Sequence, residues 1–153
     1  MKRKLFYSHL DVLMADPVKP TPEFKRTYQL TRMWQGLHTL ENTTTGTVDD
    51  WSVVSDAINI MESLLEMGWL ADPDNLLEES MQAMSNAGHR HQDGQPLQLT
   101  KEEGNVIHGL LEDYASALEQ LPYRVMITAH RKTQQRVHDI LDGKLRPHDV
   151  KFV

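Results

Sequence analysis

The chain has 153 residues, no cysteine and a formal charge of −6, from 16 basic and 22 acidic residues. This length predicts a single domain whose core is stable without cross-links, and the missing cysteines exclude disulfide scaffolds, zinc–thiolate sites and cysteine nucleophiles. No run approaches the roughly 20 apolar residues that span a bilayer, so we expect a cytoplasmic protein without membrane contact.

Residues 1–22 are predicted to form an N-terminal extension that is partly extended. Residues 5–13 fit either a short strand or a helical turn. Three prolines between positions 17 and 22 exclude a helix within that stretch and favour extended polyproline geometry. Thr21 is then the expected capping residue of a helix with Pro22 at its first position.

The first long helix is predicted over residues 22–41. Phe24 and Tyr28 lie off its apolar stripe, and Gly36 inside it costs roughly 1 kcal/mol relative to alanine. We therefore expect another backbone to approach the helix closely at Gly36. The apolar stripe itself follows the spacing of one helix face and consists of Leu30, Met33, Trp34, Leu37 and Leu40.

The segment 48–69 is the most informative part of the sequence. Thr47 and Asp50 have the spacing of a capping box, which predicts a helix start. The apolar residues that follow repeat in steps of three and four and cover roughly 200° of the helix. A helix with apolar residues around more than half of its circumference is predicted to be central in the fold, or to bury one face against a second copy in a homodimer.

A third helix is predicted over 74–87, with Asp72 as its cap and Gly88 as its terminator. Residues 89–99 are then predicted to form a loop, because Gly94 and Pro96 interrupt any helical pattern.

Two further helices complete the pattern. Thr100 and Glu103 form a second capping box, which opens a helix over 101–121. Pro122 separates it from the last helix, at 123–141.

The elements together predict an all-α, single-domain bundle of about five helices. The bundle is expected over 23–146, and residues 147–153 are expected to form a C-terminal tail.

Charge is unevenly distributed. Residues 1–32 and 122–153 each carry seven basic and three acidic residues, whereas residues 33–121 carry two basic and sixteen acidic ones. The acids either line solvated helix faces and attract the basic ends, or present a negative surface to a basic partner. The candidate partner-binding residues of the second reading are Asp56, Glu62, Glu66, Glu78 and Glu79.

The last helix offers a different function. It carries a group of basic side chains, and a basic helix is the minimum that phosphate contact requires. No aromatic residues interleave with these charges, so pairing with the acidic middle of the chain is the competing interpretation. The candidate nucleic-acid-binding residues are Arg124, Arg131, Lys132 and Arg136.

Histidines offer a third function. His89 and His91, with Asp93 near them, have the residue types of a metal site but lack a second pair of ligands. His130 lies within the apolar stripe of the last helix, where it is either a hydrogen-bonded core residue or part of a site at a helix junction. The sequence predicts no metal site and no cofactor.

Two segments are similar to known sequences: 30–41 (LTRMWQGLHTLE) and 49–62 (DDWSVVSDAINIME). Through these segments, the chain resembles a set of small uncharacterised helical proteins of proteobacterial prophages and mobile elements. The resemblance implies a cytoplasmic accessory protein and carries over no functional residue. Accessory proteins of phages often bind host machinery, including nucleic-acid-directed defence complexes, and this analogy suggests a protein partner.

The leading hypothesis is therefore a non-enzymatic protein that docks an acidic and apolar surface on a host protein. A nucleic-acid-binding regulator and a histidine-based metal protein or enzyme are the alternatives.

Overall fold

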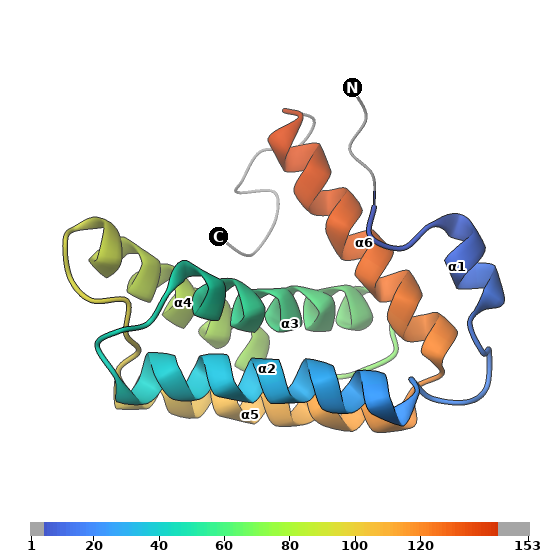
Figure 1. The fold of residues 1–153 in the computed structure, drawn as a ribbon, viewed down its shortest axis with the longest axis horizontal. Coiled ribbons are helices and arrows are strands. Elements are labelled where there is room, and N and C mark those ends of the chain that lie inside the picture. Colours follow the sequence, from blue (N-terminus) through green and yellow to red (C-terminus); the bar gives the residue numbers. More distant parts are fainter. Residues whose placement is uncertain (1–4, 144–153) are drawn as a thin grey trace.

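The computed structural model describes residues 5–143 and is built from helices alone in that range (Figure 1). The predicted all-α bundle is thereby confirmed, with one additional short helix in the N-terminal extension. An isolated bridge joins Pro20 to Pro122. The helices are α1 (His9–Met14), α2 (Glu23–Asn42), α3 (Val48–Glu66), α4 (Leu76–Gln92), α5 (Lys101–Gln120) and α6 (Tyr123–Leu141).

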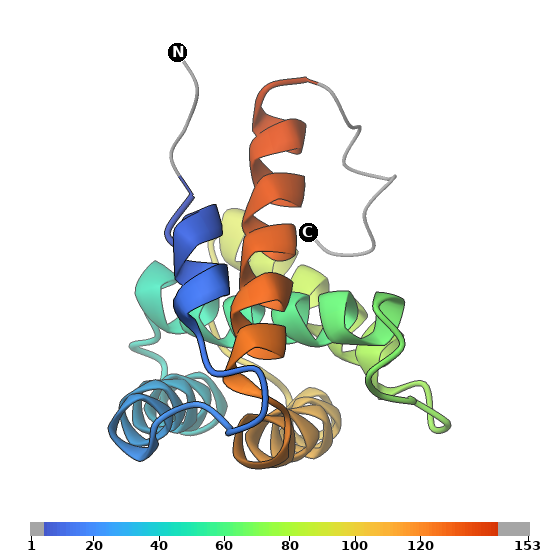
Figure 2. The same cartoon turned by 90° about the vertical axis from the view of Figure 1, so that its right-hand side faces the viewer.

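Helix α3 is central, as the wide arc of apolar residues around it predicts. It packs against α2, α4, α5 and α6, and Val54, Ile58, Met61 and Leu64 are at most 2% exposed. Helices α2 and α5 lie side by side beneath it, and α6 crosses it steeply (Figures 1 and 2). Burying apolar side chains on several sides of one helix supplies most of the packing that a bundle of this kind needs.

Both predicted capping boxes are present. Asp50 N donates to Thr47 Oγ1 at 3.2 Å, and Asp50 Oδ2 accepts from Thr47 N at 2.9 Å. Thr100 and Glu103 make the same two bonds at the start of α5. These contacts satisfy backbone donors that the first turn of a helix leaves unpaired.

The start of α2 corrects one prediction. Pro22 occupies the capping position rather than the first helical position, and Thr21 makes no capping bond. The Thr21 side chain is instead buried, and its carbonyl oxygen accepts from Arg26 Nη1 at 2.6 Å.

The start of α4 differs from the prediction in register. Asp72 does cap the helix, since its carboxylate accepts from Leu76 N and Leu77 N at 2.9 Å each. The helix nevertheless begins at Leu76, two residues later than predicted, after Asn75 in a left-handed conformation (φ 57°).

The predicted end of α4 at Gly88 is wrong. The helix runs through Gly88 to Gln92. A β-carbon at Gly88 would lie at an ordinary contact distance of 3.8 Å from the Trp51 ring, whose Nε1 donates to Met84 O at 3.1 Å. The chain turns only at Gly94, with φ 94°, where Gln95 N donates to Arg90 O. This is a Schellman-type ending, which glycine favours.

The close approach expected at Gly36 is confirmed. A β-carbon at this position would lie 3.2 Å from the Asp50 carbonyl oxygen, so the glycine brings α2 close to the start of α3. Gly109 faces the Leu76 side chain, at an ordinary contact distance of 3.5 Å.

The N-terminal segment is fastened to the first turn of α6. Arg124 donates from Nε to Val12 O at 3.1 Å and from Nη2 to Leu13 O at 2.8 Å. The backbone adds Tyr123 N to Lys19 O and Arg124 N to Asp16 O. Helix α1 therefore lies beside α6 in both views (Figures 1 and 2). No helix within residues 5–143 combines the length and the apolar character that crossing a membrane requires.

Candidate binding site

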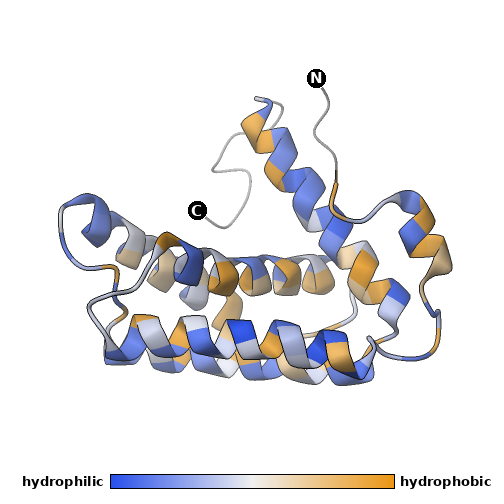
Figure 3. Ribbon diagram, viewed as in Figure 1, coloured by the Kyte–Doolittle hydropathy of each residue, from blue (hydrophilic) through white to orange (hydrophobic). Residues whose placement is uncertain are grey.

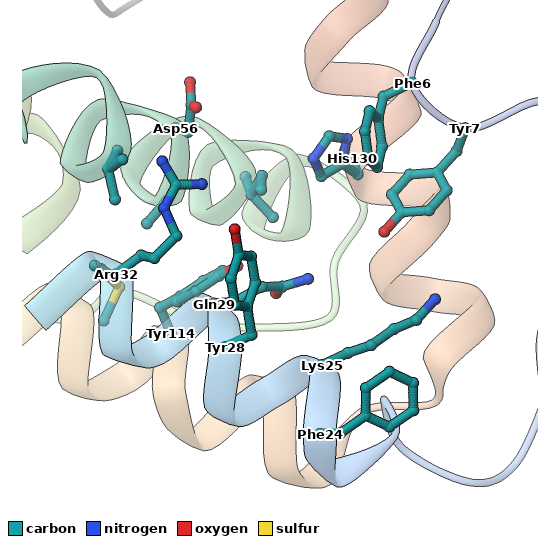
Figure 4. A pocket seen from close by; sticks show the side chains of 14 residues that line it. Phe6, Tyr7, Phe24, Lys25, Tyr28, Gln29, Arg32, Asp56, Tyr114 and His130 are labelled. Carbon is teal, nitrogen blue, oxygen red and sulfur yellow. The ribbon is translucent and has the colours of Figure 1, made fainter. Parts of the chain in front are cut away.

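A cleft of about 610 Å³ opens between α2, α3, α6 and the segment before α1 (Figure 4). Its floor is apolar, since the side chains of Met33, Ala57, Ile60 and Tyr114 are all buried there. Burial raises the pKa of Tyr114, so its phenol stays protonated. A preformed apolar hollow with polar groups at its edge is the usual form of a binding site.

Aromatic rings line the mouth of the cleft. Phe24 and Tyr28 come from α2 and are 72% and 64% exposed, and Phe6 and Tyr7 come from the segment before α1. The Tyr7 ring stands edge-on to the imidazole of His130, with the ring centres 5.0 Å apart. Burial, followed by its contact with Tyr123, raises the pKa of Tyr7 to about 12.

One face of α2 supplies polar groups to the same cleft. Lys25, Gln29 and Arg32 are spaced by four and three residues, so they lie along one side of the helix. Lys25 Nζ donates to the Tyr123 hydroxyl at 2.7 Å, and the Arg32 guanidinium lies 5.7 Å from the centre of the Tyr28 ring.

Asp56 of α3 is the acidic residue among those that line the cleft. Its side chain is exposed, yet the protein around the carboxyl group raises its pKa by desolvation, while the charge of Arg32 acts in the opposite direction. With Lys25 and Arg32 the lining carries two cations and one acidic group.

His130 belongs to the wall of the cleft and also to a smaller hollow of about 190 Å³ between α3 and α6. Its Nδ1 atom is buried and has no hydrogen-bond partner within the described residues. Burial lowers the pKa of the imidazole, which therefore favours the neutral form. His130 is thus a residue of a helix junction rather than a fully hydrogen-bonded core residue.

The five acidic candidates do not share one surface. Asp56 faces the cleft, whereas Glu62 is 3% exposed and lies 3.5 Å from Arg136. Its burial removes Glu62 from any exposed acidic surface. Glu66 pairs with Arg136 at 3.3 Å and with Lys132 at 3.5 Å. Glu78 and Glu79 are exposed in the first turn of α4.

Most of the basic candidates are occupied within the protein. Arg136 lies between α3 and α6, where Nη2 donates to Asn59 O and Ser63 Oγ at 3.3 Å each. Arg124 holds the N-terminal segment, and Lys132 faces Glu66. Arg131 is half-buried. Lys132 and Arg136 therefore pair with acidic residues of the middle of the chain, which is the alternative to nucleic-acid binding that the sequence left open.

The loop predicted around His89 and His91 is wrong, because both residues lie in the last turn of α4. His91 Nδ1 is 2.9 Å from Gln95 O, which places the ring at the helix end. Across residues 5–143 no three side chains of metal-binding type gather in one place.

Comparison with protein-family models, curated proteins and solved structures finds no match. The cleft was not predicted from sequence, although Phe24 and Tyr28 gave one signal, since they lie off the apolar stripe of their helix. Lys25, Arg32 and Tyr7 gave none, because only the crossing of helices brings them near Asp56 and His130.

Proposed function

We propose that the chain is a non-enzymatic accessory protein that binds another protein through an exposed apolar surface. The observation that carries this proposal is the position of the large apolar side chains. Seven of the ten that are exposed in the described part of the chain fall between residues 6 and 28, although the core is elsewhere well closed. They are Phe6, Leu10, Leu13, Met14, Val18, Phe24 and Tyr28.

Four of these side chains, on α1 and directly after it, form what we call the N-terminal apolar surface: Leu10, Leu13, Met14 and Val18. They are between 55% and 79% exposed. Helix α1 lies at the edge of the molecule, and much of its ribbon has the colour of hydrophobic residues (Figure 3). Clustered exposed apolar residues are typical of sites where another protein binds.

The anchoring of α1 supports the same role. Arg124 binds two of its carbonyl oxygens, so the helix is held in place although none of its own residues is buried. A surface held before binding loses less conformational entropy when a partner docks.

The charge around the N-terminal apolar surface is small. Residues 9–20 contain two acidic residues, Asp11 and Asp16, and one basic residue, Lys19. We therefore propose a partner that contacts this surface mainly through an apolar patch of its own. This revises the expected docking surface from acidic and apolar to mainly apolar.

Site-specific photocrosslinking tests the proposal. A photoreactive phenylalanine analogue is introduced at Leu13 in one version of the protein and at Gln82, exposed on α4, in the control. We expect a crosslinked protein that depends on position 13, and its purified form should bind the wild type but not the double variant L10D/M14D. Crosslinks that are equally abundant from both positions, or equal binding of the double variant, would refute the proposal.

A further inference from the structure

The aromatic cleft has the size and composition of a small-molecule site and is separate from the N-terminal apolar surface. Its volume of about 610 Å³ lies within the range of roughly 300–1,000 Å³ that such sites occupy. The buried floor and the rings of Tyr28 and Phe24 offer flat apolar contacts (Figure 4). Aromatic walls favour a planar, unsaturated body over a flexible aliphatic one.

The positively charged side chains of the cleft then favour planar ligands that carry a negative charge. Lys25 uses one of its three donors on Tyr123, which leaves two for a ligand. Arg32 is exposed, and within residues 5–143 its guanidinium makes no hydrogen bond or ion pair; it lies near the ring of Tyr28. Both cations line the cleft of a protein whose net charge is −6. An acid group on the ligand would therefore find hydrogen-bond donors ready for it.

We propose that the cleft binds a small planar aromatic molecule that carries one anionic acid group, a carboxylate or a sulfonate. The ring system packs on the floor formed by Ala57 and Ile60 and against Tyr28, and the acid group lies at Arg32, whereas Lys25 lies at the other end of the cleft (Figure 4). Asp56 faces Arg32 from α3, so its negative charge weakens binding of the one acid group and also opposes a second one.

Two fluorescent probes that differ in one acid group test this assignment on the full chain. 8-Anilinonaphthalene-1-sulfonate carries the acid group, and N-phenyl-1-naphthylamine has the same rings without it. We expect saturable one-site binding of the sulfonate probe. The variant R32Q should weaken it roughly tenfold, because a charge-assisted contact is lost, and should change binding of the neutral probe by less than twofold.

Asp56→Asn provides a test of opposite sign. Removing the carboxylate should strengthen binding of the sulfonate probe several-fold and leave the neutral probe unchanged. The variant Y28A should weaken both probes, since it removes a wall of the cleft. K101Q, at the exposed start of α5, is the matched charge-loss control and should change neither.

Near-ultraviolet circular dichroism establishes that each variant is folded. Equal affinities of the wild type and R32Q for the sulfonate probe would overturn the assignment, as would equal weakening of both probes by R32Q. The double variant L10D/M14D should keep full affinity for the sulfonate probe, so this result does not depend on the partner-binding proposal.

Discussion

Glu103 performs two tasks at the start of α5. Its Oε1 accepts from Thr100 N at 2.8 Å and from Arg90 Nη2 at 2.6 Å, while Oε2 accepts from Arg90 Nη1 at 3.0 Å. One carboxylate thus completes a capping box and ties α4 to α5. Burial acts to raise the pKa of Glu103, but the hydrogen bonds and charge of Arg90, together with Thr100, lower it overall.

The variant E103Q should lower the free energy of unfolding by about 1–2 kcal/mol at pH 7. Because the folded pKa lies below the ordinary value of about 4.5, this stabilisation is present above that pH and is lost as the pH falls through the folded value. Urea unfolding should therefore separate the wild type from E103Q by more at pH 7 than at pH 3. E102Q, one residue away and exposed, is the control; an equal difference at both pH values would contradict the role of the ion pair.

His130 should make stability depend on pH in a different window. Its folded pKa lies below the ordinary value of 6.5, so the unfolded chain binds a proton first when the pH falls below 6.5. Stability should then decrease between pH 7.5 and 5.5, and the variant H130Q should lose less over that interval. Thermal unfolding at both pH values measures this, with H89Q as the control. Identical losses in the wild type and H130Q would show that the imidazole is not the cause.

At the scale of helices, two glycines inside α2 and α5 look alike in sequence but have different surroundings. Gly36 has the Asp50 carbonyl oxygen 3.2 Å from where a β-carbon would lie, and backbone cannot move aside easily. Gly109 meets the end of the Leu76 side chain at 3.5 Å.

Alanine at these two positions should have effects of opposite sign. G109A should stabilise the protein by up to about 1 kcal/mol through helix propensity. G36A should destabilise it, because separating α2 from α3 outweighs the same gain in propensity. Chemical denaturation of both variants measures the difference, and a stabilised G36A would show that the two helices separate without cost.

Local signals explain which helices could be predicted. The capping boxes at Thr47 and Thr100 act within four residues, and helical periodicity acts within one segment, so α3 and α5 follow from sequence. The end of α4 does not, because Gly88 and Gly94 are both acceptable terminators in sequence, and the chain turns at Gly94, where φ is 94°.

The cleft could be predicted even less. Its walls come from the segment before α1 and from α2, α3, α5 and α6, and their meeting depends on crossing angles that no local pattern encodes. The same holds for the buried position of Glu62, whose charge alone indicates a solvated residue.

For the molecule as a whole, the Arg124 guanidinium is the group that joins α1 to α6 by side-chain hydrogen bonds within residues 5–143. Replacing Arg124 with glutamine removes its bonds to Val12 O and Leu13 O but leaves the buried core untouched. We expect faster amide hydrogen exchange over residues 9–20 with little change over α3, because local opening costs less than global unfolding. R26Q, which loses a bond to Thr21 O within its own neighbourhood, is the control. Unchanged exchange over residues 9–20 in the Arg124 variant would show that other contacts hold the segment.

The bonds that hold the N-terminal segment also impose an order of assembly. Phe6 N reaches Gln134 Oε1 across 128 positions, and Arg124 reaches Val12 across 112. On the ribosome, α2 to α5 emerge before α6 exists, and contacts between distant positions form late. The side of the cleft that Phe6, Tyr7 and His130 form is therefore the last to close. Until synthesis reaches α6, the apolar floor of the cleft stays accessible to chaperones in the nascent chain.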